Sequence, residues 1–330
     1  MKDPTVSVIT PSYNQAQYLE KTIQSVLAQD YPEIEYIIVD GGSTDGSVEI
    51  IKRYQSKLAW WVSEADEGQA SAINKGMARA RGEIVAWINS DDLYLPRAIT
   101  GAVASFRSNP KVNLVFGDAI TIDAEGIPLK KLIFSDWGLI DLAAFRIICQ
   151  PAVFMRRDAF QAVKGLNLNY HFMLDHQLWI RIASLGPIKH EAAFWAAARH
   201  HGEAKNVSQA AAFGRETMEV LDWMNNQDDL GPVIRENHRK VYAGAYRLNG
   251  RYLLDGGEFK PALKSYTKAF INQPEYTARH WHRIAYACMG LLGVKNLDNL
   301  YSRYQESQRP DLSSMDEIRG WPGLSPEISE

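Results

Sequence analysis

The alternation of short apolar runs with helical patterns over the first ninety residues constrains the fold more than any other feature. Apolar runs at residues 6–10, 36–39 and 60–63 have the length of strands. Between these runs, apolar residues such as Leu19 and Ile23 recur at helical spacing. Because strands that alternate with helices usually pair in parallel, we expect an α/β fold with a central mixed, mostly parallel sheet.

A fourth apolar run, residues 84–88, ends in the motif Asn89-Ser90-Asp91-Asp92. Adjacent carboxylates repel each other unless a cation or a hydrogen-bond donor neutralises them, and open α/β sheets bind ligands at the carboxyl ends of their strands. The pair therefore indicates a metal-assisted site. Asp is also a common turn and helix-capping residue, so these residues alone leave a plain strand-to-helix turn open.

Beyond this motif, strands and helices alternate less regularly. We expect strands at residues 112–116, 119–122 and 150–155, a turn at 124–126, and helices at 158–163 and 174–185. From about residue 213 onward the chain is helical in pattern. The sequence therefore predicts a main domain at 1–210, a smaller all-α region at 211–309 and a loose tail at 310–330.

Composition excludes some partners and predicts a cytoplasmic protein. With 36 Lys and Arg against 39 Asp and Glu, the net charge of −3 gives no basic footprint for nucleic acid. The apolar runs are shorter than the roughly 20 residues that span a bilayer, and the N-terminus lacks the apolar segment of a signal peptide. Cys149 and Cys288 show no metal-ligand spacing, so we expect both to be reduced, buried and structural.

One part of the helical region has the pattern of a known repeat. Gly257, Tyr266, Ala269 and Pro274 fall at the spacings of the second helix of a tetratricopeptide-type hairpin. Stable arrays need about three such units, and the sequence shows one clear copy. We therefore expect a helical hairpin that packs on the main domain, with the binding of a protein partner as the alternative role.

Polar loops also follow the first two apolar runs. The Gly-rich turn at 40–47 has neither the dinucleotide-binding nor the Walker order of glycines. Asp40 can instead accept a hydrogen bond from a nucleobase N–H, and Tyr13 can stack on a base. A capping turn and ordinary packing are the alternatives for these residues. Three neighbouring strand ends with polar loops are what a nucleotide cleft in such a sheet requires.

Three motifs together resemble glycosyltransferase family 2, whose fold is the Rossmann-like GT-A type. They are the run at 6–14, the turn at 39–45 and the motif at 89–92, in this order and spacing. The resemblance covers roughly the first 205 residues. It implies a GT-A fold for the main domain and a nucleotide sugar as ligand.

The resemblance also implies roles for individual residues. The positions that match the family's nucleotide-sugar residues are Pro11, Tyr13 and Asp40 for the nucleobase, Asp66 for the diphosphate and sugar, and Asp91 for the ribose. Asp92 matches the last residue of the DxD-type motif and is expected to bind Mg²⁺ or Mn²⁺. Hard cations of this kind prefer oxygen ligands and neutralise a departing diphosphate.

The family takes its catalytic base from a Glu-Asp-x-x-Leu-Trp-x-Arg pattern at the start of a helix. Residues 174–181 match this pattern, except that Leu174 replaces the first acidic residue. The resemblance therefore implies that Asp175 removes the proton of the acceptor hydroxyl. Without the family match, a lone Asp at this position is usually a helix N-cap.

A second family pattern, Arg-x-His-x-x-Ser-Lys, closes the domain. Residues 199–205 match it, with Ala204 in place of the Ser. His201 or Lys205 could reach the diphosphate or the metal from this loop, and a polar surface loop is the alternative.

Together, these assignments predict an inverting, metal-dependent glycosyltransferase. We expect a nucleotide-sugar donor, a UDP-sugar first, and a glycan or lipid-linked acceptor in polysaccharide or glycan biosynthesis. A lipid-linked acceptor would add peripheral association with the inner face of the membrane. Two alternatives are a sugar-nucleotidyltransferase, although residues 11–17 lack a basic residue to hold a triphosphate, and a non-catalytic scaffold that binds nucleotide sugars.

Overall fold

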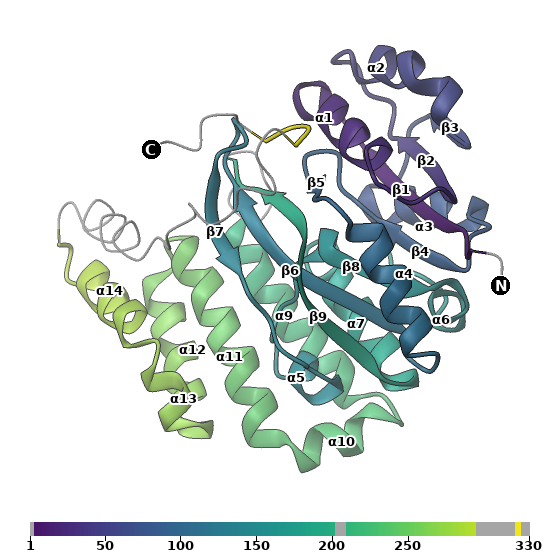
Figure 1. The fold of residues 1–330 in the computed structure, drawn as a ribbon. Helices are drawn as coiled ribbons and strands as arrows, with labels where there is room; N and C mark the ends of the chain where they lie inside the picture. The colour runs from purple at the N-terminus through teal and green to yellow at the C-terminus, as the bar shows by residue number, and fades with distance from the viewer. Residues whose placement is uncertain (1–2, 202–208, 295–320, 325–330) are drawn as a thin grey trace. The chain divides into compact units, whose positions relative to one another are not determined.

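The computed structural model describes residues 3–201, 209–294 and 321–324. The chain forms two compact units. The colours of Figure 1, which follow residue number, allow the residues of each unit to be found. Unit 1 comprises residues 1–137, 148–200 and 310–330, and unit 2 comprises residues 138–147 and 201–309. A short internal segment of the main domain therefore groups with the helical region, and the C-terminal tail groups with unit 1.

Unit 1 is built on a nine-stranded sheet with the order β3-β2-β1-β4-β8-β6-β9-β5, in which β7 pairs with β6. The strands are β1 (Val6–Ser12), β2 (Ile34–Asp40), β3 (Trp60–Ser63), β4 (Ile84–Trp87), β5 (Leu93–Tyr94), β6 (Leu114–Ile122), β7 (Pro128–Leu132), β8 (Val153–Arg156) and β9 (Ile188–Arg199). The half from β3 to β4 is parallel, and β9 is parallel to β6, whereas β5, β7 and β8 pair antiparallel. The predicted mixed α/β class is confirmed.

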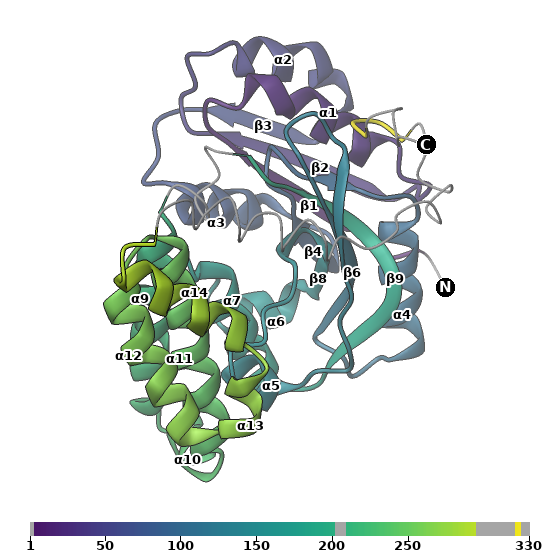
Figure 2. The same cartoon turned by 90° about the vertical axis from the view of Figure 1, so that its left-hand side faces the viewer.

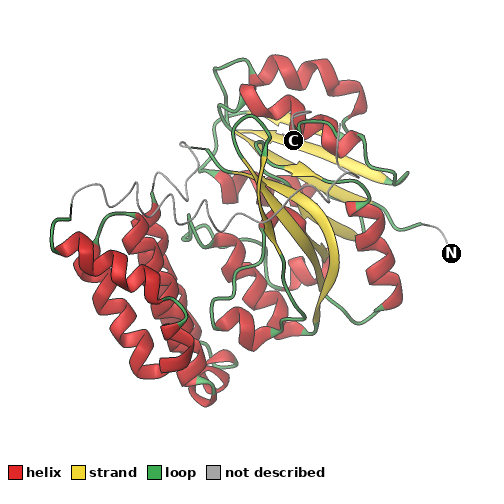
Figure 3. Ribbon diagram, turned by 60° about the vertical axis from the view of Figure 1, so that its left-hand side comes forward, coloured by secondary structure: helices red, strands yellow, loops and turns green. Residues whose placement is uncertain are grey.

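The helices of unit 1 are α1 (Ala16–Leu27), α2 (Ser47–Tyr54), α3 (Gln69–Arg79), α4 (Ala98–Ser108), α6 (Arg157–Ala162) and α7 (Leu174–Leu185), with short 3₁₀ turns η1 (Gln55–Lys57) and η2 (Gln150–Ala152). Figure 3 shows helices on both sides of the sheet, and Figure 2 shows α1 and α2 on one side of β1–β3 with α3 on the other. β1, β2 and β4 are therefore buried on both faces, whereas the residues of the edge strand β3 are half-buried.

Alternation along β1 divides its side chains between the two faces. Val8 joins one core cluster with Leu19 of α1 and Ile99 of α4. Ile9 faces α3, where an added Cβ on Gly76 would come within 2.6 Å of the Ile9 side chain. Because successive residues of a strand point to opposite faces, the continuous apolar run at 6–10 supplies both layers.

The second half of the sheet differs from the sequence prediction. β6 is one continuous strand where two short strands are expected at 112–116 and 119–122. β9 is not predicted by the strand patterns, because five of its 12 residues are alanine, which is depleted in strands. Trp195 of β9 packs over the backbone of Gly117, where an added Cβ would lie 2.5 Å from the indole. Tertiary packing, rather than local propensity, forms this strand.

Unit 2 consists of α5 (Leu139–Ala143), α9 (Ala210–Asn225), α10 (Leu230–Glu236), α11 (His238–Asp255), α12 (Phe259–Asn272), α13 (Pro274–Ala278) and α14 (Trp281–Leu291). α11 packs against both α9 and α12, as the ribbons in Figures 1 and 2 also show. Cys288 on α14 is exposed, so the expectation that it is buried is wrong. No helix in the described parts of the chain has the length and hydropathy to cross a bilayer.

Polar contacts from one face of α11 hold the segment 138–147. Lys240 Nζ donates a hydrogen bond to Asp141 Oδ1 at 2.8 Å, and Arg247 Nη2 donates to the carbonyl of Phe145 at 3.0 Å. Lys240 and Arg247 are seven residues apart, so they lie on the same side of the helix. The segment is therefore anchored at two points, two helical turns apart.

The described residues of the C-terminal tail pack against β5. Trp321 Nε1 donates to the carbonyl of Tyr94 at 2.7 Å, and Leu324 is buried in a small cluster with Leu93. Gly323 has a φ of 88°, and an added Cβ there would lie within 3.0 Å of Leu93. Because β5 is an edge strand, the Trp321 indole covers a carbonyl that would otherwise be left unpaired by the sheet. The rest of the predicted loose tail lies outside the described residues.

Gly244→Ala should destabilise unit 2. An added Cβ on Gly244 would lie 1.9 Å from the carbonyl oxygen of Ala144, so α11 would have to move away from the segment 138–147. Overpacking of this kind costs about 1–3 kcal/mol, and urea unfolding followed by circular dichroism should show a lower midpoint. Gly138→Ala is the matched control, because an added Cβ there meets nothing within 4 Å. Equal midpoints for both variants would contradict this packing.

Candidate active site

The loops that follow β1 and β2 are tied together by hydrogen bonds. The Asn14 amide donates to Ser43 Oγ at 2.8 Å, and the Thr44 amide donates to Asn14 Oδ1 at 2.9 Å. Asp45 Oδ2 accepts from the Ala16 amide at 2.8 Å, at the start of α1. Burial by itself raises the pKa of Asp45, but hydrogen bonds, led by the one from Ala16, outweigh it and hold that pKa below its usual value. An ionised Asp45 therefore fixes both loops.

Asp40, the predicted nucleobase residue, is fully buried and anchors the turn that follows it. Its Oδ2 accepts from the amides of Gly42 and Ser43 at 3.1 and 2.9 Å, and from the Ser63 hydroxyl at 2.6 Å. Its Oδ1 accepts from the Ser43 hydroxyl at 2.5 Å. Because Ser63 ends β3, Asp40 also joins the ends of two strands. Contact with a nucleobase stays a prediction.

Gly41 allows Asp66 and Tyr13, two residues predicted to bind the nucleotide sugar, to approach each other. An added Cβ on Gly41 would lie 3.0 Å from Asp66 Oδ2 and 3.3 Å from the ring of Tyr13. Tyr13 is 64% exposed, which is unusual for a packing residue and suits a ring that stacks on a ligand. Pro11 lies in β1, opposite Val39 of β2. The first two loops and the loop after β3 therefore meet at one edge of the sheet.

Arg199, the last residue of β9, clamps the acidic motif. Its amide donates to Asp92 Oδ1 at 2.9 Å, and its Nε donates to the carbonyl of Asp91 at 2.8 Å. Asn89 Nδ2 donates to Asp92 Oδ2 at 3.1 Å. The guanidinium is buried and lies over the ring of Tyr18, 4.8 Å from its centroid. Burial lowers the pKa of Arg199, although nearby carboxylates, led by Asp92, oppose this effect.

The environment of Asp92 suits a bound cation. Burial, followed by the charge of Asp91, raises the pKa of Asp92 well above its usual value. A cation would compensate both effects. Asp92 is 5% exposed and both its oxygens accept hydrogen bonds, whereas Asp91 is more exposed. Each carboxylate oxygen has a second lone pair, so the donor set of this pair fits Mg²⁺ or Mn²⁺.

The two carboxylates do not make a complete metal centre. Among the described residues, no group of three or more His, Cys, Asp or Glu side chains is arranged to hold a metal ion. Mg²⁺ in enzymes is commonly held by one or two carboxylates together with substrate phosphates and water. A cation at this pair would therefore need the diphosphate of a substrate as well.

A stacked tryptophan pair brings Asp175 to this edge. Trp87 ends β4, just before the acidic motif, and stacks on Trp179 of α7 with ring centroids 5.0 Å apart. Both indoles are buried, and such a pair adds about 0.5–1.5 kcal/mol to the area that it buries. Asp175 lies one helical turn before Trp179, on the same face of α7. It is partly buried, and its Oδ1 accepts from the His176 amide at 2.6 Å.

Cys149 provides a second link between Asp175 and the acidic pair. Burial, followed by the charges of Asp92 and Asp175, raises the pKa of the Cys149 thiol. Both carboxylates therefore act on this one thiol through their charge. The next residue, Gln150, donates from Nε2 to the carbonyl of Trp87 at 2.7 Å. The segment 149–150 therefore contacts the end of β4, and its thiol is influenced by both Asp92 and Asp175, which are far apart in the sequence.

Several buried polar atoms on these elements have no hydrogen-bond partner within the described protein. They are Ser12 Oγ, Trp87 Nε1, Gln150 Oε1, Trp179 Nε1 and Arg199 Nη2. Buried polar groups are nearly always paired, by protein or by ordered water. A concentration of such atoms beside a strand-end edge is typical of a site that a polar ligand completes.

Two contributors to the site have no role in the sequence prediction. Arg199 belongs to a matched pattern, but its clamp on the acidic motif is visible only in three dimensions. Gln69, which begins α3, donates from Nε2 to Asn89 Oδ1 at 2.8 Å and so links the loop after β3 to the motif. His201 follows β9 and is partly buried, and Lys205 lies outside the described residues.

Comparisons with known proteins identify the family. The family model described as "Glycosyl transferase family 2" matches residues 7–164. An uncharacterised glycosyltransferase from Nostoc sp. is 32% identical over 220 residues, which cover 63% of this chain and 68% of the relative. Chondroitin synthase from Escherichia coli is 25% identical over 191 residues, which cover 57% of this chain and 28% of that protein. The chain therefore spans two thirds of one relative and about a quarter of the other.

Solved structures show the same fold. Staphylococcus aureus TarS 1–349 in complex with UDP-GlcNAc matches with a TM-score of 0.62 at 17% identity, covering 92% of this chain and 90% of that chain. The mannosyltransferase PcManGT from Pyrobaculum calidifontis, in complex with GDP-Man and Mn²⁺, matches with a TM-score of 0.59 at 19% identity, covering 92% and 85%. These likenesses confirm the predicted GT-A type of fold. The chain belongs to glycosyltransferase family 2.

Proposed function

We propose that the protein is an inverting glycosyltransferase that moves a sugar from a nucleotide sugar to an acceptor hydroxyl. The observation that supports this proposal most is the Trp87–Trp179 stack, which joins the strand before the Asp91–Asp92 pair to the helix that carries Asp175. A single displacement needs charge compensation for the leaving diphosphate and a separate base for the acceptor. The two sets of carboxylates supply these functions from different elements of unit 1.

For the donor we propose a UDP-sugar. The exposed ring of Tyr13 offers a surface on which a base can stack. Asp40 holds Ser43, whose hydroxyl accepts from the amide of Asn14, the residue after Tyr13. The TarS structure holds UDP-GlcNAc and the PcManGT structure holds GDP-Man, so both nucleotides fit this fold. Asp66 lies against Gly41 beside Tyr13, which supports a place near the diphosphate and sugar.

For the cation we propose the acidic pair, with Asp92 as the predicted ligand and Asp91 as a second candidate. Asp92 is held by Arg199 and Asn89, whereas Asp91 is the more exposed carboxylate. The Mn²⁺ in the PcManGT complex supports a divalent cation in this fold. When bound, Mg²⁺ or Mn²⁺ supplies positive charge that stabilises the leaving diphosphate.

Asp175 acts as the general base in this proposal. Its carboxylate takes the proton of the acceptor hydroxyl while that oxygen attacks the anomeric carbon, and the bond to the diphosphate breaks on the opposite face. The position in the first turn of α7 stabilises the carboxylate, because helix N-termini favour negative charge. The Trp87–Trp179 stack fixes the helix and limits the reach of this side chain.

The acceptor that we propose is a glycan or a lipid-linked precursor. The relative chondroitin synthase supports a role in polysaccharide synthesis. A lipid-linked acceptor would bring the protein from the cytoplasm to the inner face of the membrane. A sugar-nucleotidyltransferase would need a basic residue after β1 to hold a triphosphate, and residues 11–17 contain none.

Asp175→Asn should abolish transfer and leave donor binding intact. The amide cannot take the acceptor proton, and general bases contribute about 10²–10⁴-fold to rate. We would measure the release of nucleoside diphosphate from UDP-sugars in the presence of Mn²⁺ and acceptor, and donor binding by thermal shift. Retention of the wild-type rate would refute the assignment of the base.

Asp158→Asn is the matched control for this variant. Asp158 also lies in the first turn of a helix, α6, and its Oδ1 accepts from the next backbone amide, that of Ala159, at 2.7 Å. It therefore reproduces the local geometry of Asp175 outside the proposed site. We expect the control to keep the wild-type rate, and an equal loss in both variants would indicate a structural effect.

Asp91→Asn and Asp92→Asn should each reduce the stabilisation that Mn²⁺ adds to bound UDP. A ligand at about 100 times its Kd stabilises a protein by about 2.7 kcal/mol, which a thermal shift detects readily. The measurement compares UDP with Mn²⁺ against UDP with EDTA for each variant, with Asp158→Asn as control. The larger loss identifies the main ligand, and a full Mn²⁺ effect in both variants would place the cation elsewhere.

A further inference from the structure

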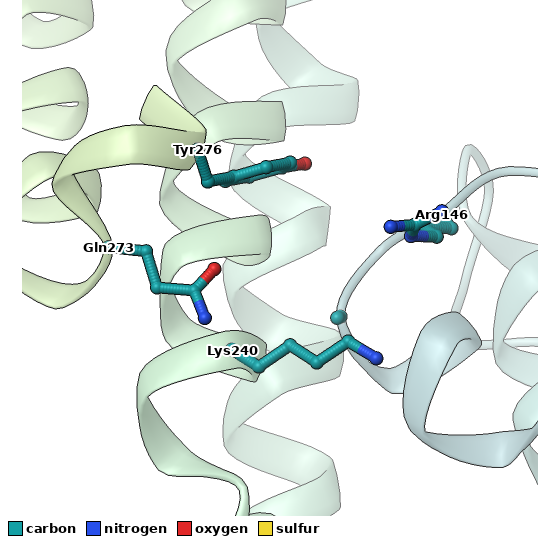
Figure 4. A pocket seen from close by; sticks show the side chains of 5 residues that line it. Arg146, Lys240, Gln273 and Tyr276 are labelled. Carbon is teal, nitrogen blue, oxygen red and sulfur yellow. The ribbon is translucent and has the colours of Figure 1, made fainter. Parts of the chain in front are cut away.

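A small pocket in unit 2 is lined by Ala144, Arg146, Lys240, Gln273 and Tyr276. Figure 4 shows the side chains of Lys240 on α11, Gln273 in the turn between α12 and α13, and Tyr276 on α13, projecting toward the loop that carries Arg146. The cavity has a volume of about 40 Å³, which is room for roughly three water molecules or one small ion. None of the five lining residues belongs to the candidate active site.

The chain segments that build this pocket are strongly basic. Residues 138–147, α11 and residues 273–283 contain seven Arg or Lys and three Asp or Glu, which gives a net charge of +4 in a chain whose net charge is −3. The ring of His280 packs edge to face against that of Tyr276, with the ring centroids 5.7 Å apart. The positive charge of these segments acts on its imidazole. Burial, followed by the charges of Arg247 and Arg283, lowers the pKa of His280 to about 4.

Asp141 is the carboxylate nearest to the two cations of the lining. It accepts a hydrogen bond from Lys240 Nζ at 2.8 Å, and its Oδ1 lies 3.6 Å from Arg146 Nε. Although burial raises the pKa of Asp141, the contacts with Lys240, Gly138 and Arg146 outweigh burial and keep that pKa below its usual value. Asp141 is therefore ionised, and it contacts both cations of the lining.

Two neutral side chains add hydrogen-bond donors to the same cavity. Tyr276 Oη accepts from Arg247 Nε at 3.1 Å, so its own proton is directed away from that guanidinium. Gln273 supplies an amide group with two N–H donors, and Figure 4 places it between Lys240 and Tyr276. Two cations and two neutral donors around a small volume form the donor set that binds phosphate oxygens.

The donors are also held in place before any ligand binds. Lys240 is fixed by Asp141, and Arg247, which positions Tyr276, donates to the carbonyl of Phe145 at 3.0 Å. Gly244 brings α11 into direct contact with Ala144, which lines the pocket. Preorganised donors lose less entropy on binding than flexible ones.

We propose that this pocket binds a tetrahedral oxyanion of the phosphate type, either as free phosphate or as a phosphodiester group within a larger molecule. The charge of the segments, the cavity volume and the convergence of donors on it support this proposal. The binding is independent of the proposed transfer reaction, so it is tested without an activity assay.

The experiment is isothermal titration calorimetry of the full chain with inorganic phosphate, at constant ionic strength and with EDTA present. EDTA prevents phosphate from binding through a divalent cation at the acidic pair. Lys240→Met removes a cation of the lining, and Gln273→Ala removes one of its neutral donors. Lys260→Met is the control, because exposed Lys260 on α12 does not line the pocket. A parallel titration uses dimethyl phosphate.

We expect the wild type and Lys260→Met to bind phosphate equally, and both pocket variants to bind it about tenfold more weakly, since a hydrogen bond to a charged group is worth about 1.5–3 kcal/mol. Circular dichroism checks that each variant is folded. If Lys240→Met does not fold, Gln273→Ala still tests the proposal. Tighter binding of inorganic phosphate than of dimethyl phosphate would identify the free ion as the ligand, and similar binding would identify a phosphodiester. Absence of binding by both probes, or equal affinity in wild type and Gln273→Ala, would overturn the proposal.

Discussion

The buried carboxylate of Asp92 is the constraint on which the candidate site depends. A charge removed from water must be compensated by donors or by a cation, because an unpaired buried charge costs several kcal/mol. Arg199 and Asn89 supply the donors. Since Arg199 ends β9, the long last strand must reach this edge of the sheet, and β9 does so by pairing with both β6 and β5. The position of β9 and the charge of Asp92 are therefore linked.

The same constraint explains the contacts that surround β5. This strand has two residues and begins directly after Asp92, so a shift of β5 would move the carboxylate away from Arg199. β9 pairs with one edge of β5, the hydroxyl of Ser25 accepts from the Tyr94 amide at 3.2 Å, and Trp321 donates to the Tyr94 carbonyl. Contacts from three distant parts of the chain thus hold a strand that is too short to be stable alone.

Local patterns predicted the elements whose periodicity is strong and missed those formed by distant contacts. The helix at 174–185 has the predicted bounds, because its apolar residues follow helical spacing closely. Asp92 and Arg199 are 107 positions apart, and no spacing rule connects residues so far apart in sequence. For this reason, neither the role of Arg199 nor the Ala-rich strand β9 could be predicted from sequence patterns. Asp175 could be singled out only through family resemblance, since its link to the acidic pair depends on the Trp87–Trp179 stack.

The boundary between the two units follows contacts rather than sequence order. The family model matches residues 7–164, and this range includes the segment 138–147, which packs with the helices of unit 2. Lys240, Gly244 and Arg247 lie along one face of α11 and hold that segment by an ion pair, a close backbone contact and a hydrogen bond. Gly244 is needed because its Cα lies against the backbone of Ala144 within unit 2. The packing at Gly244 indicates that the segment and α11 are one structural element, so residues 138–147 take their conformation from helices that follow the family domain in sequence.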